Sequence, residues 1–408
     1  MRKIISVALC VLAQAALLSP SHAVVSIPGY ELVHTVPVET NLATPDLSDP
    51  ITVWSQMFDS ATEQIVIGQF YAASKPGSAF DKVIERLAAA GQRGVKIRFL
   101  MEEKGKPASE PSTIERLKQI PNLEFRTLDY SKITGNGIIH AKYLVVDAKT
   151  AYVGSQNFDW RSFEHIHETG LRITDANVVA QVQAIFEQDW QAQELIAQGK
   201  KVPPLNQHNV DANRQSEHYL VASPNAYNPA GVGNSETELP ALLAQAKTEI
   251  RIQLLDYAPL SYGPNRTRPY YAVIDNAIRS ALARGVKVKL MVSNWNTEKP
   301  AINYLKSLAM LPGIEIKIVT LPKASTGFIP FARVIHSKTM SIDGQIAWIG
   351  TSNWSGGYLD NSRNLEVVLR NTTMAQRIAE LHQQTWDSDY AQSIDINKDY
   401  PKPAKGQE

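Results

Sequence analysis

The stretch His140-Ala141-Lys142-Tyr143-Leu144-Val145-Val146-Asp147 and the stretch His336-Ser337-Lys338-Thr339-Met340-Ser341-Ile342-Asp343 share one pattern, H-x-K-x-x-x-x-D. Each histidine is followed 17 residues later by an asparagine, Asn157 in the first copy and Asn353 in the second. Self-similarity at a long period controls the interpretation of a fold, and two copies are too few for a solenoid. The sequence therefore predicts two similar halves that share one active site.

The similarity extends to both sides of the motif. Upstream, residues 93–100 (RGVKIRFL) match residues 284–291 (RGVKVKLM). Downstream, each half has a carboxylate, Glu168 or Glu366, and each has a tryptophan 50 residues after its histidine. We expect each of these two carboxylates to accept a hydrogen bond from a histidine ring, which would fix the tautomer of that ring.

Strand-like and helix-like segments alternate in both halves, which is typical of an α/β fold. In the first half we expect strands at 65–71, 95–100, 123–127, 143–146 and 151–153, and helices at 80–90, 113–120 and 176–190. In the second half we expect strands at 250–255, 286–292, 314–320, 339–342 and 346–349, and helices at 239–246, 271–283, 302–310 and 374–386. We expect an extended lead-in at 24–50 and an irregular tail after Asp387. The predicted domains are residues 24–197 and 216–408, joined by a linker at 198–215.

Residues 1–23 have the composition of a secretory signal peptide. Arg2 and Lys3 precede an apolar run, and small residues at 21–23 offer a cleavage site. The run is shorter than the ~20 residues that a membrane span needs, so we expect cleavage and no stable membrane anchor. The single cysteine, Cys10, lies inside this segment. An exported protein without disulfides fits a periplasmic or secreted bacterial protein.

The overall charge is close to zero. The chain has 41 Lys and Arg and 40 Asp and Glu, and removal of Arg2 and Lys3 leaves a net charge of −1. This balance argues against a general basic surface for nucleic acid but leaves room for a local basic cleft.

Paired histidines and lysines suit phosphodiester chemistry. If the motif is a strand, residues two apart, such as His140 and Lys142, lie on the same face. One histidine can attack phosphorus as a nucleophile, and the other can protonate the leaving oxygen and later deprotonate water. The lysines and the two asparagines would stabilise the charged phosphate, and the scheme requires no metal or other cofactor. Asp147 and Asp343, which precede turns, are expected to be structural.

These residues resemble the phospholipase D superfamily, and within it the membrane-anchored lysosomal five-prime exonucleases of single-stranded nucleic acid. The resemblance is strongest at 154–162 (GSQNFDWRS), 329–334 (IPFARV), 350–356 (GTSNWSG) and 386–388 (WDS). It implies two α/β sandwich domains with pseudo-twofold symmetry and an active site at their interface. The chain lacks the cysteines of those relatives and has a cleavable signal in place of their anchor.

The same resemblance implies specific roles for the motif residues. It makes His140 the nucleophile and His336 the general acid and base, with a phosphohistidine as the intermediate. It also implies that the phosphate is held by Lys142, Lys338, Asn157 and Asn353.

Weaker signals surround the motifs. The pair His165 and His167 suggests metal ligands, but without a third ligand nearby a surface or supporting role is favoured. Two arginines, Arg161 and Arg333, are candidates for contact with a second phosphate. Aromatic residues that could stack on bases near the cleft are Trp160, Phe163, Trp295, Phe328 and Phe331.

The leading hypothesis is a phosphodiesterase that acts as an exonuclease on single strands. The alternative is a phospholipase D or phosphatidyl transferase, similar to a cardiolipin synthase, because the same site chemistry serves both. A lipid enzyme should expose apolar loops, and residues 327–331 (GFIPF) are the candidate. A third hypothesis, an inactive scaffold, conflicts with intact His, Lys and Asn sets in both halves. The sequence leaves the substrate, the cleavage polarity and a possible homodimer open.

Overall fold

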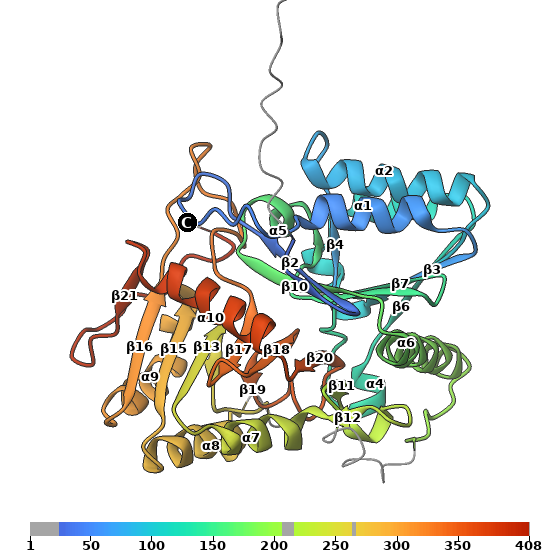
Figure 1. Cartoon of the computed structure of the whole chain (residues 1–408). Helices are drawn as coiled ribbons and strands as arrows, with labels where there is room; N and C mark the ends of the chain where they lie inside the picture. Colours follow the sequence, from blue (N-terminus) through green and yellow to red (C-terminus); the bar gives the residue numbers. More distant parts are fainter. Residues whose placement is uncertain (1–23, 206–215, 263–266, 408) are drawn as a thin grey trace, which may run out of the picture.

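The computed structural model describes residues 24–205, 216–262 and 267–407. The expected signal peptide, residues 1–23, lies outside the described residues, as do residues 206–215 of the expected linker. The described chain forms two large mixed sheets with helices packed on them, the first at the upper right of Figure 1 and the second at the lower left.

The first sheet has the strand order β1-β2-β10-β8-β7-β3-β5-β6. Its strands are β1 (Ser26–Ile27), β2 (Tyr30–Thr35), β3 (Gln64–Gln69), β5 (Lys96–Glu102), β6 (Leu123–Leu128), β7 (Tyr143–Val146), β8 (Thr150–Gly154) and β10 (Glu168–Ile173). The helices of this half are α1 (Pro50–Ser60), α2 (Ala79–Gln92), α3 (Pro111–Lys118), α4 (Ser131–Thr134), α5 (Trp160–Glu164) and α6 (Ala176–Ala197). A separate two-stranded pair joins β4 (Ala72–Ala73) to β9 (Phe158–Asp159).

The second sheet repeats this order as β12-β11-β20-β18-β17-β13-β15-β16-β21. Its strands are β11 (His218–Ser223), β12 (Gly233–Asn234), β13 (Glu249–Leu254), β15 (Lys287–Ser293), β16 (Ile314–Val319), β17 (Lys338–Ile342), β18 (Ile346–Gly350), β20 (Asn364–Leu369) and β21 (Ala391–Ser393). The helices are α7 (Ser235–Gln245), α8 (Ala272–Ala283), α9 (Ala301–Ala309) and α10 (Thr372–Trp386). The two-stranded pair here joins β14 (Tyr257–Ala258) to β19 (Trp354–Ser355).

Both faces of each sheet are covered, which explains why the strands are almost wholly apolar. Successive side chains of a strand point to opposite faces, so Ile65 and Ile67 pack in the cluster with α1 and α2, while Val66 packs in the cluster with α6. Parallel strands buried in this way have near-continuous runs of Val, Ile and Leu. The duplicated strand sequences therefore produce duplicated three-layer halves.

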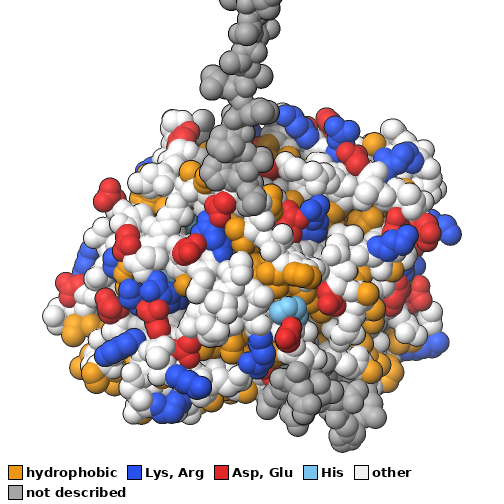
Figure 2. All heavy atoms as spheres, viewed as in Figure 1, with side chains coloured by type: hydrophobic (Ala, Val, Ile, Leu, Met, Phe, Trp, Pro, Cys, Tyr) orange, Lys and Arg blue, Asp and Glu red, His pale blue; other side chains and the backbone are white. Residues whose placement is uncertain are grey.

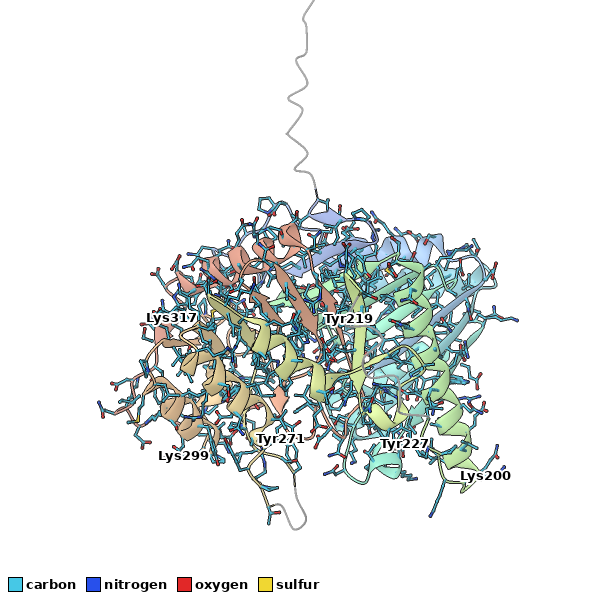
Figure 3. All side chains as sticks on the ribbon, turned by 60° about the horizontal axis from the view of Figure 1, so that its bottom comes forward. Lys200, Tyr219, Tyr227, Tyr271, Lys299 and Lys317 are labelled. Carbon is cyan, nitrogen blue, oxygen red and sulfur yellow. The ribbon has the colours of Figure 1, made fainter. Side chains whose placement is uncertain are left out.

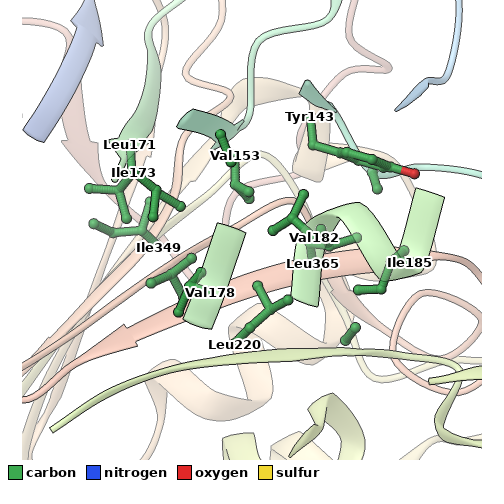
Figure 4. Packing of buried hydrophobic residues seen from close by; sticks show 14 of the residues in the cluster. Tyr143, Val153, Leu171, Ile173, Val178, Val182, Ile185, Leu220, Ile349 and Leu365 are labelled. Atoms are coloured by element: carbon green, nitrogen blue, oxygen red, sulfur yellow. The ribbon is translucent and has the colours of Figure 1, made fainter. Parts of the chain in front are cut away.

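A shared core joins the two halves. Apolar residues of α6 and α10 and of both sheets belong to one buried cluster. Figure 4 shows Val178 and Val182 of α6 close to Leu171 of the first sheet and to Leu220 and Ile349 of the second. With the bottom of the molecule turned forward, Figure 3 places Lys200, just after α6, on the opposite flank from Lys299 and Lys317 of the second half. The two sheets are therefore fixed against each other where β8 and β10 of the first meet β18 and β20 of the second.

The prediction of an α/β fold with two similar halves is confirmed, and each expected strand and helix is present. The main differences concern the segments outside the repeat. The lead-in is not simply extended, because β2 pairs with β10 inside the first sheet and α1 follows it. Helix α6 continues to Ala197, beyond the predicted end, and the tail adds strand β21 to the second sheet. Within the described ranges, no helix combines the length and apolar character needed to cross a bilayer.

Candidate active site

Each motif histidine is held in place by the backbone of the opposite half. The amides of His140 and Ala141 both donate to the carbonyl of Arg363, at 2.9 Å each. The amides of His336 and Ser337 donate to the carbonyl of His167, at 2.8 and 3.0 Å. The histidines lie just before the strands β7 and β17, so alternation along a strand does not by itself place each histidine beside its lysine. The cross-half bonds give the two motifs matching positions about a pseudo-twofold axis.

Both halves contribute to one cavity of about 270 Å³. Its lining includes the four residues His140, His336, Asn157 and Asn353. The motif lysines are fully buried beside it. Lys142 Nζ donates to the carbonyl of His140, and Lys338 Nζ donates to the carbonyl of His336 at 2.6 Å. The structure thus brings the predicted His, Lys and Asn sets together.

The two lysines create a strong preference for an anion. Burial lowers the pKa of Lys338 to about 7, although Glu168 and Asp256 oppose the shift. Burial and the nearby charge of Lys338 hold the pKa of Lys142 well below its usual range. Because two buried cations disfavour each other's charge, an anion bound between them would stabilise both ammonium groups.

His140 is oriented by a neutral amide. Its Nδ1 lies 3.0 Å from Asn364 Oδ1. The Asn364 side chain donates through Nδ2 to the carbonyl of Tyr358 and accepts from the hydroxyl of Thr351, both at 2.9 Å. Its Oδ1 is therefore an acceptor, so Nδ1 of His140 carries the proton and Nε2 carries the lone pair. Burial, Lys142 and Lys338 also lower the pKa of His140, which keeps the ring neutral.

His336 is oriented by a carboxylate. Its Nδ1 lies 2.7 Å from Glu168 Oε2, and Glu168 is fully buried. Burial raises the pKa of Glu168 to about 7, against the opposing effects of Lys338 and of the hydroxyls of Ser155 and Ser162. Burial, Lys338 and Lys142 lower the pKa of His336. The hydrogen bond with Glu168 thus fixes the Nδ1 side of the ring and leaves Nε2 for proton exchange.

Glu366 does not occupy the position expected for it. Its carboxylate accepts hydrogen bonds from Ser235 and Ser352, and it lies opposite Gly350 in the sheet. The expected hydrogen bond from a histidine ring to Glu366 is therefore wrong, since Asn364 accepts from His140 in that place. The signal was present in the sequence, because Glu168 and Asn364 each follow their histidine by 28 residues while Glu366 follows by 30.

The motif aspartates organise the turns before β3 and β13. Asp147 accepts hydrogen bonds from the amides of Thr62, Glu63 and Gln64, all at 2.9 Å. Asp343 accepts from the amides of Lys247, Thr248 and Glu249 in the same way. Both lie away from the cavity, which agrees with the structural role expected of them.

The other expected residues divide into those that reach the cavity and those that do not. Arg161, Trp295 and Phe331 line it. Phe163 is buried in the core, Trp160 packs against His165, and Phe328 lines a neighbouring hollow. Arg333 is tied to the carbonyls of Pro322 and Val38, both at 2.6 Å, and His167 Nδ1 lies 3.0 Å from Gln253 Nε2.

Sequence reasoning missed three aromatic residues of the lining, namely Phe70, Tyr71 and Tyr358. The ring of Tyr358 stands edge-on to His140, with 4.8 Å between the ring centroids. The ring centroid of Phe70 lies 5.8 Å from that of His140, and the two ring planes are tilted. No motif marks these residues, because each lies outside the repeated strands, just after β3 or just after β19.

The sequence of this chain is similar to those of known proteins. The sequence model of the family described as "Cardiolipin synthase, PLD-like domain" matches residues 55–190 and 239–386. The chain is 31% identical over 374 residues to "5'-3' exonuclease PLD3" of Xenopus laevis, which covers 83% of this chain and 75% of that protein. It is 27% identical over 394 residues to "Virion nicking-joining enzyme" of vaccinia virus (strain Western Reserve), which covers 89% of each.

A third relative and a solved structure extend the comparison. The chain is 27% identical over 396 residues to "Probable phospholipase D F09G2.8" of Caenorhabditis elegans, covering 89% of this chain and 70% of that protein. The crystal structure of phosphatidylserine synthase of Haemophilus influenzae superposes with a TM-score of 0.57 at 10% identity, covering 84% of this chain and 85% of that one. At that identity the superposition bears on the fold alone.

Proposed function

The chain belongs to the phospholipase D-like family and is a phosphodiesterase; we propose that it forms a phosphohistidine on His140 and shortens single-stranded nucleic acid as an exonuclease. The observation that carries this proposal is the different environment of the two histidines in one cavity. The neutral ring of His140 suits a nucleophile, and Glu168, by holding Nδ1 of His336, stabilises the protonated ring that can donate from Nε2 as a general acid.

In the first step Nε2 of His140 bonds to phosphorus as the bond from phosphorus to the leaving oxygen breaks. His336 gives its proton to that oxygen. In the second step His336 removes a proton from water, the water oxygen bonds to phosphorus, and the bond to His140 breaks. Both histidines then return to their starting states.

The phosphate is held by the remaining motif residues in this scheme. Lys142 and Lys338 supply positive charge inside a buried site, where electrostatic stabilisation is strongest because water does not screen it. Asn157 and Asn353 offer amide donors from opposite halves. These fixed groups would stabilise the additional negative charge of the transition state without rearranging.

Two features support a chain end as the substrate. A cavity of about 270 Å³ is slightly smaller than the ~300–1,000 Å³ typical of small-ligand sites, so it suits one end group. On the face drawn in Figure 2, basic and acidic side chains are interspersed, which does not suit a long duplex footprint. The aromatic residues Trp295, Phe331 and Tyr358 can pack against an unpaired base.

A phospholipid is the second candidate. The cavity wall includes the apolar residues Ile138, Ile166, Leu255 and Val334, and Phe331 is 48% exposed at its rim. An apolar rim of this kind could meet the acyl part of a lipid. The same two-step chemistry would then release the headgroup alcohol.

One experiment separates the two candidates. Residues 24–408 are incubated in EDTA with end-labelled single-stranded DNA that has a five-prime hydroxyl, and with phospholipid vesicles in a parallel tube. We expect stepwise shortening of the DNA that is lost in both His140→Ala and His336→Ala. His165→Ala, a histidine outside the cavity, is the matched control and should keep full activity. Release of phosphatidic acid with intact DNA would establish the lipid substrate instead.

We also propose that residues 1–23 direct export to the periplasm or medium and are then removed. The composition of that segment supports this, and mass spectrometry of the exported protein tests it, since an intact N-terminus would contradict it. The domain limits at 24–197 and 216–408, with the linker at 198–215, and the possible homodimer stay predictions. Limited proteolysis and a measurement of molar mass in solution test them.

A further inference from the structure

The chain does not end where the second domain is complete. After β21, residues 395–407, here called the C-terminal strap, run back across the second half. Lys306 Nζ donates to the carbonyl of Lys398 at 2.6 Å, and Thr297 Oγ1 donates to the carbonyl of Pro401 at 3.3 Å. Tyr400 packs against the core of this half. The strap is therefore held along its length rather than projecting into solvent.

The end of the strap contacts the rim of the catalytic cavity. The amide of Phe331 donates to the carbonyl of Lys405 at 2.8 Å. Gly406 lies so close to the ring of Phe331 that a Cβ there would be 2.7 Å from it. Lys405 Nζ donates to Glu298 at 2.6 Å and lies 5.8 Å from the centre of the Trp295 ring. Figure 1 places the C-terminus beside the loop that precedes β17, which carries Phe331.

Phe331 needs such support. Its φ is +58°, a left-handed conformation that a bulky side chain rarely adopts and that persists only where the surroundings enforce it. The ring is 48% exposed, so core packing does not enforce this conformation. Its other aromatic contact is Trp295, edge-on with 6.3 Å between the centroids. The strap thus supplies two contacts that fix Phe331. The Lys405 carbonyl accepts a hydrogen bond from the Phe331 amide, and Gly406 lies against the Phe331 ring.

The strap also reaches the charges of the site. Asp256 is a buried carboxylate whose pKa is raised by burial, and the positive charge of Lys405 opposes that shift. Asp256 in turn opposes the lowering of the pKa of Lys338. Lys405 is therefore part of the electrostatic surroundings of a motif lysine that lies 67 residues earlier in the sequence.

We propose that the C-terminal strap is a substrate-positioning element of the active site. Through Lys405 and Gly406 it fixes Phe331 and Trp295 as an apolar rim, against which the base next to the cleaved phosphate packs. The identity of that group as a base rests on the proposed function; the fixing of the rim by the strap does not. The strap positions substrate and takes no part in bond making.

The test removes the strap's last residues while keeping the contacts that hold its first part. A chain ending at Pro401 lacks Lys405 and Gly406 but retains Tyr400 and the bond to Thr297. We expect its KM for single-stranded DNA to rise about tenfold, the size of one lost base–aromatic contact, with kcat unchanged within about twofold. Phe331→Ala should give the same rise, and combining the two changes should add nothing.

Lys402→Ala is the matched control, because Lys402 also faces Glu298, at 3.6 Å, but its side chain is 80% exposed. It should leave KM unchanged. A truncated enzyme with wild-type KM, with a lower kcat at the same KM, or with higher activity would overturn the proposal.

Hydrogen exchange gives a readout that needs no substrate. The amide of Phe331 should exchange faster in the truncated chain, since its acceptor is gone, and unchanged exchange would overturn the proposal. If the full chain proves inactive on DNA, the proposed function fails while this measurement still decides the role of the strap.

Discussion

Replacing Asp189 with asparagine should destabilise the protein far more than a similar change one half-turn away on the same helix. Asp189 lies on α6 and accepts two hydrogen bonds from Arg363 of the opposite half, both at 2.9 Å. The remaining N–H groups of Arg363 donate to the carbonyls of Ser223 and Tyr227 and to Asn228 Oδ1, at 2.9–3.0 Å. All five donors are therefore used, and the two side chains are 0% and 2% exposed.

The size of the effect follows from burial. Removing one partner of a buried pair leaves an uncompensated charge, which costs about 3–5 kcal/mol. For the roughly 385 residues from 24 to 408, an unfolding entropy of about 2.1 cal/mol/K per residue gives about 0.8 kcal/mol/K, so a loss of about 4 kcal/mol lowers Tm by about 5 °C. Urea titration should show the same loss as a lower midpoint at unchanged slope.

Glu187→Gln is the control. Glu187 accepts two hydrogen bonds from Arg98, at 2.6 and 2.7 Å, but the side chains are 45% and 25% exposed. Surface pairs contribute about 0–1 kcal/mol, so the Tm should fall by about 1 °C at most. Equal losses in the two variants would refute the reasoning that burial makes the Arg363 pair costly to break.

Three further predictions concern the site and its turns. Asn364→Asp places a carboxylate on His140, which should raise the pKa of that ring and move the acidic limb of kcat/KM upward by about 1–2 pH units; an unmoved limb in the pH–rate profile would contradict the assigned contact. Because the pKa of Lys338 lies at about 7, the substrate-free enzyme loses this charge above neutrality, so KM measured from pH 6 to 9 should rise with pH, and a flat profile would count against its phosphate role. Asp147→Ala should cost about 1–2 kcal/mol at pH 7 by urea titration. Hydrogen bonds hold the pKa of Asp147 below its usual value despite burial, so its stabilisation exists above pH ~4 and is lost as pH falls; a difference from wild type that persisted at pH 2 would contradict this.

The repeated strands could be predicted because each carries its own apolar run between polar turns. Two elements at the N-terminal end, β2 and α1, were not predicted, each for its own reason. Strand β2 (Tyr30–Thr35) is buried but mixes apolar residues with Glu31, His34 and Thr35, and its partner β10 lies more than a hundred residues away. Helix α1 begins at Pro50 after a capping Asp49, a start signal that was present but not used.

In the candidate site too, features marked by a local motif could be predicted, and contacts between residues far apart in the sequence could not. The His, Lys and Asn sets follow from local motifs, and their meeting in one cavity follows from the duplication. The contact from His140 to Asn364 was missed because we looked for a second acidic residue and not for equal spacing. The pair of Arg363 and Asp189 spans 174 residues with no motif at either end, so only the packing of the two halves could reveal it.

The crossed backbone bonds have a consequence for how the two halves can diverge. Each histidine is fixed by a main-chain carbonyl, that of Arg363 or His167, and no side-chain substitution deletes a carbonyl. The backbone can thus keep its pseudo-twofold symmetry while the side chains of the two halves diverge. They have already diverged at the residues that orient the histidines, Asn364 and Glu168. A gene that began as two equal copies can in this way assign attack to one ring and proton delivery to the other without rebuilding the frame that aligns them.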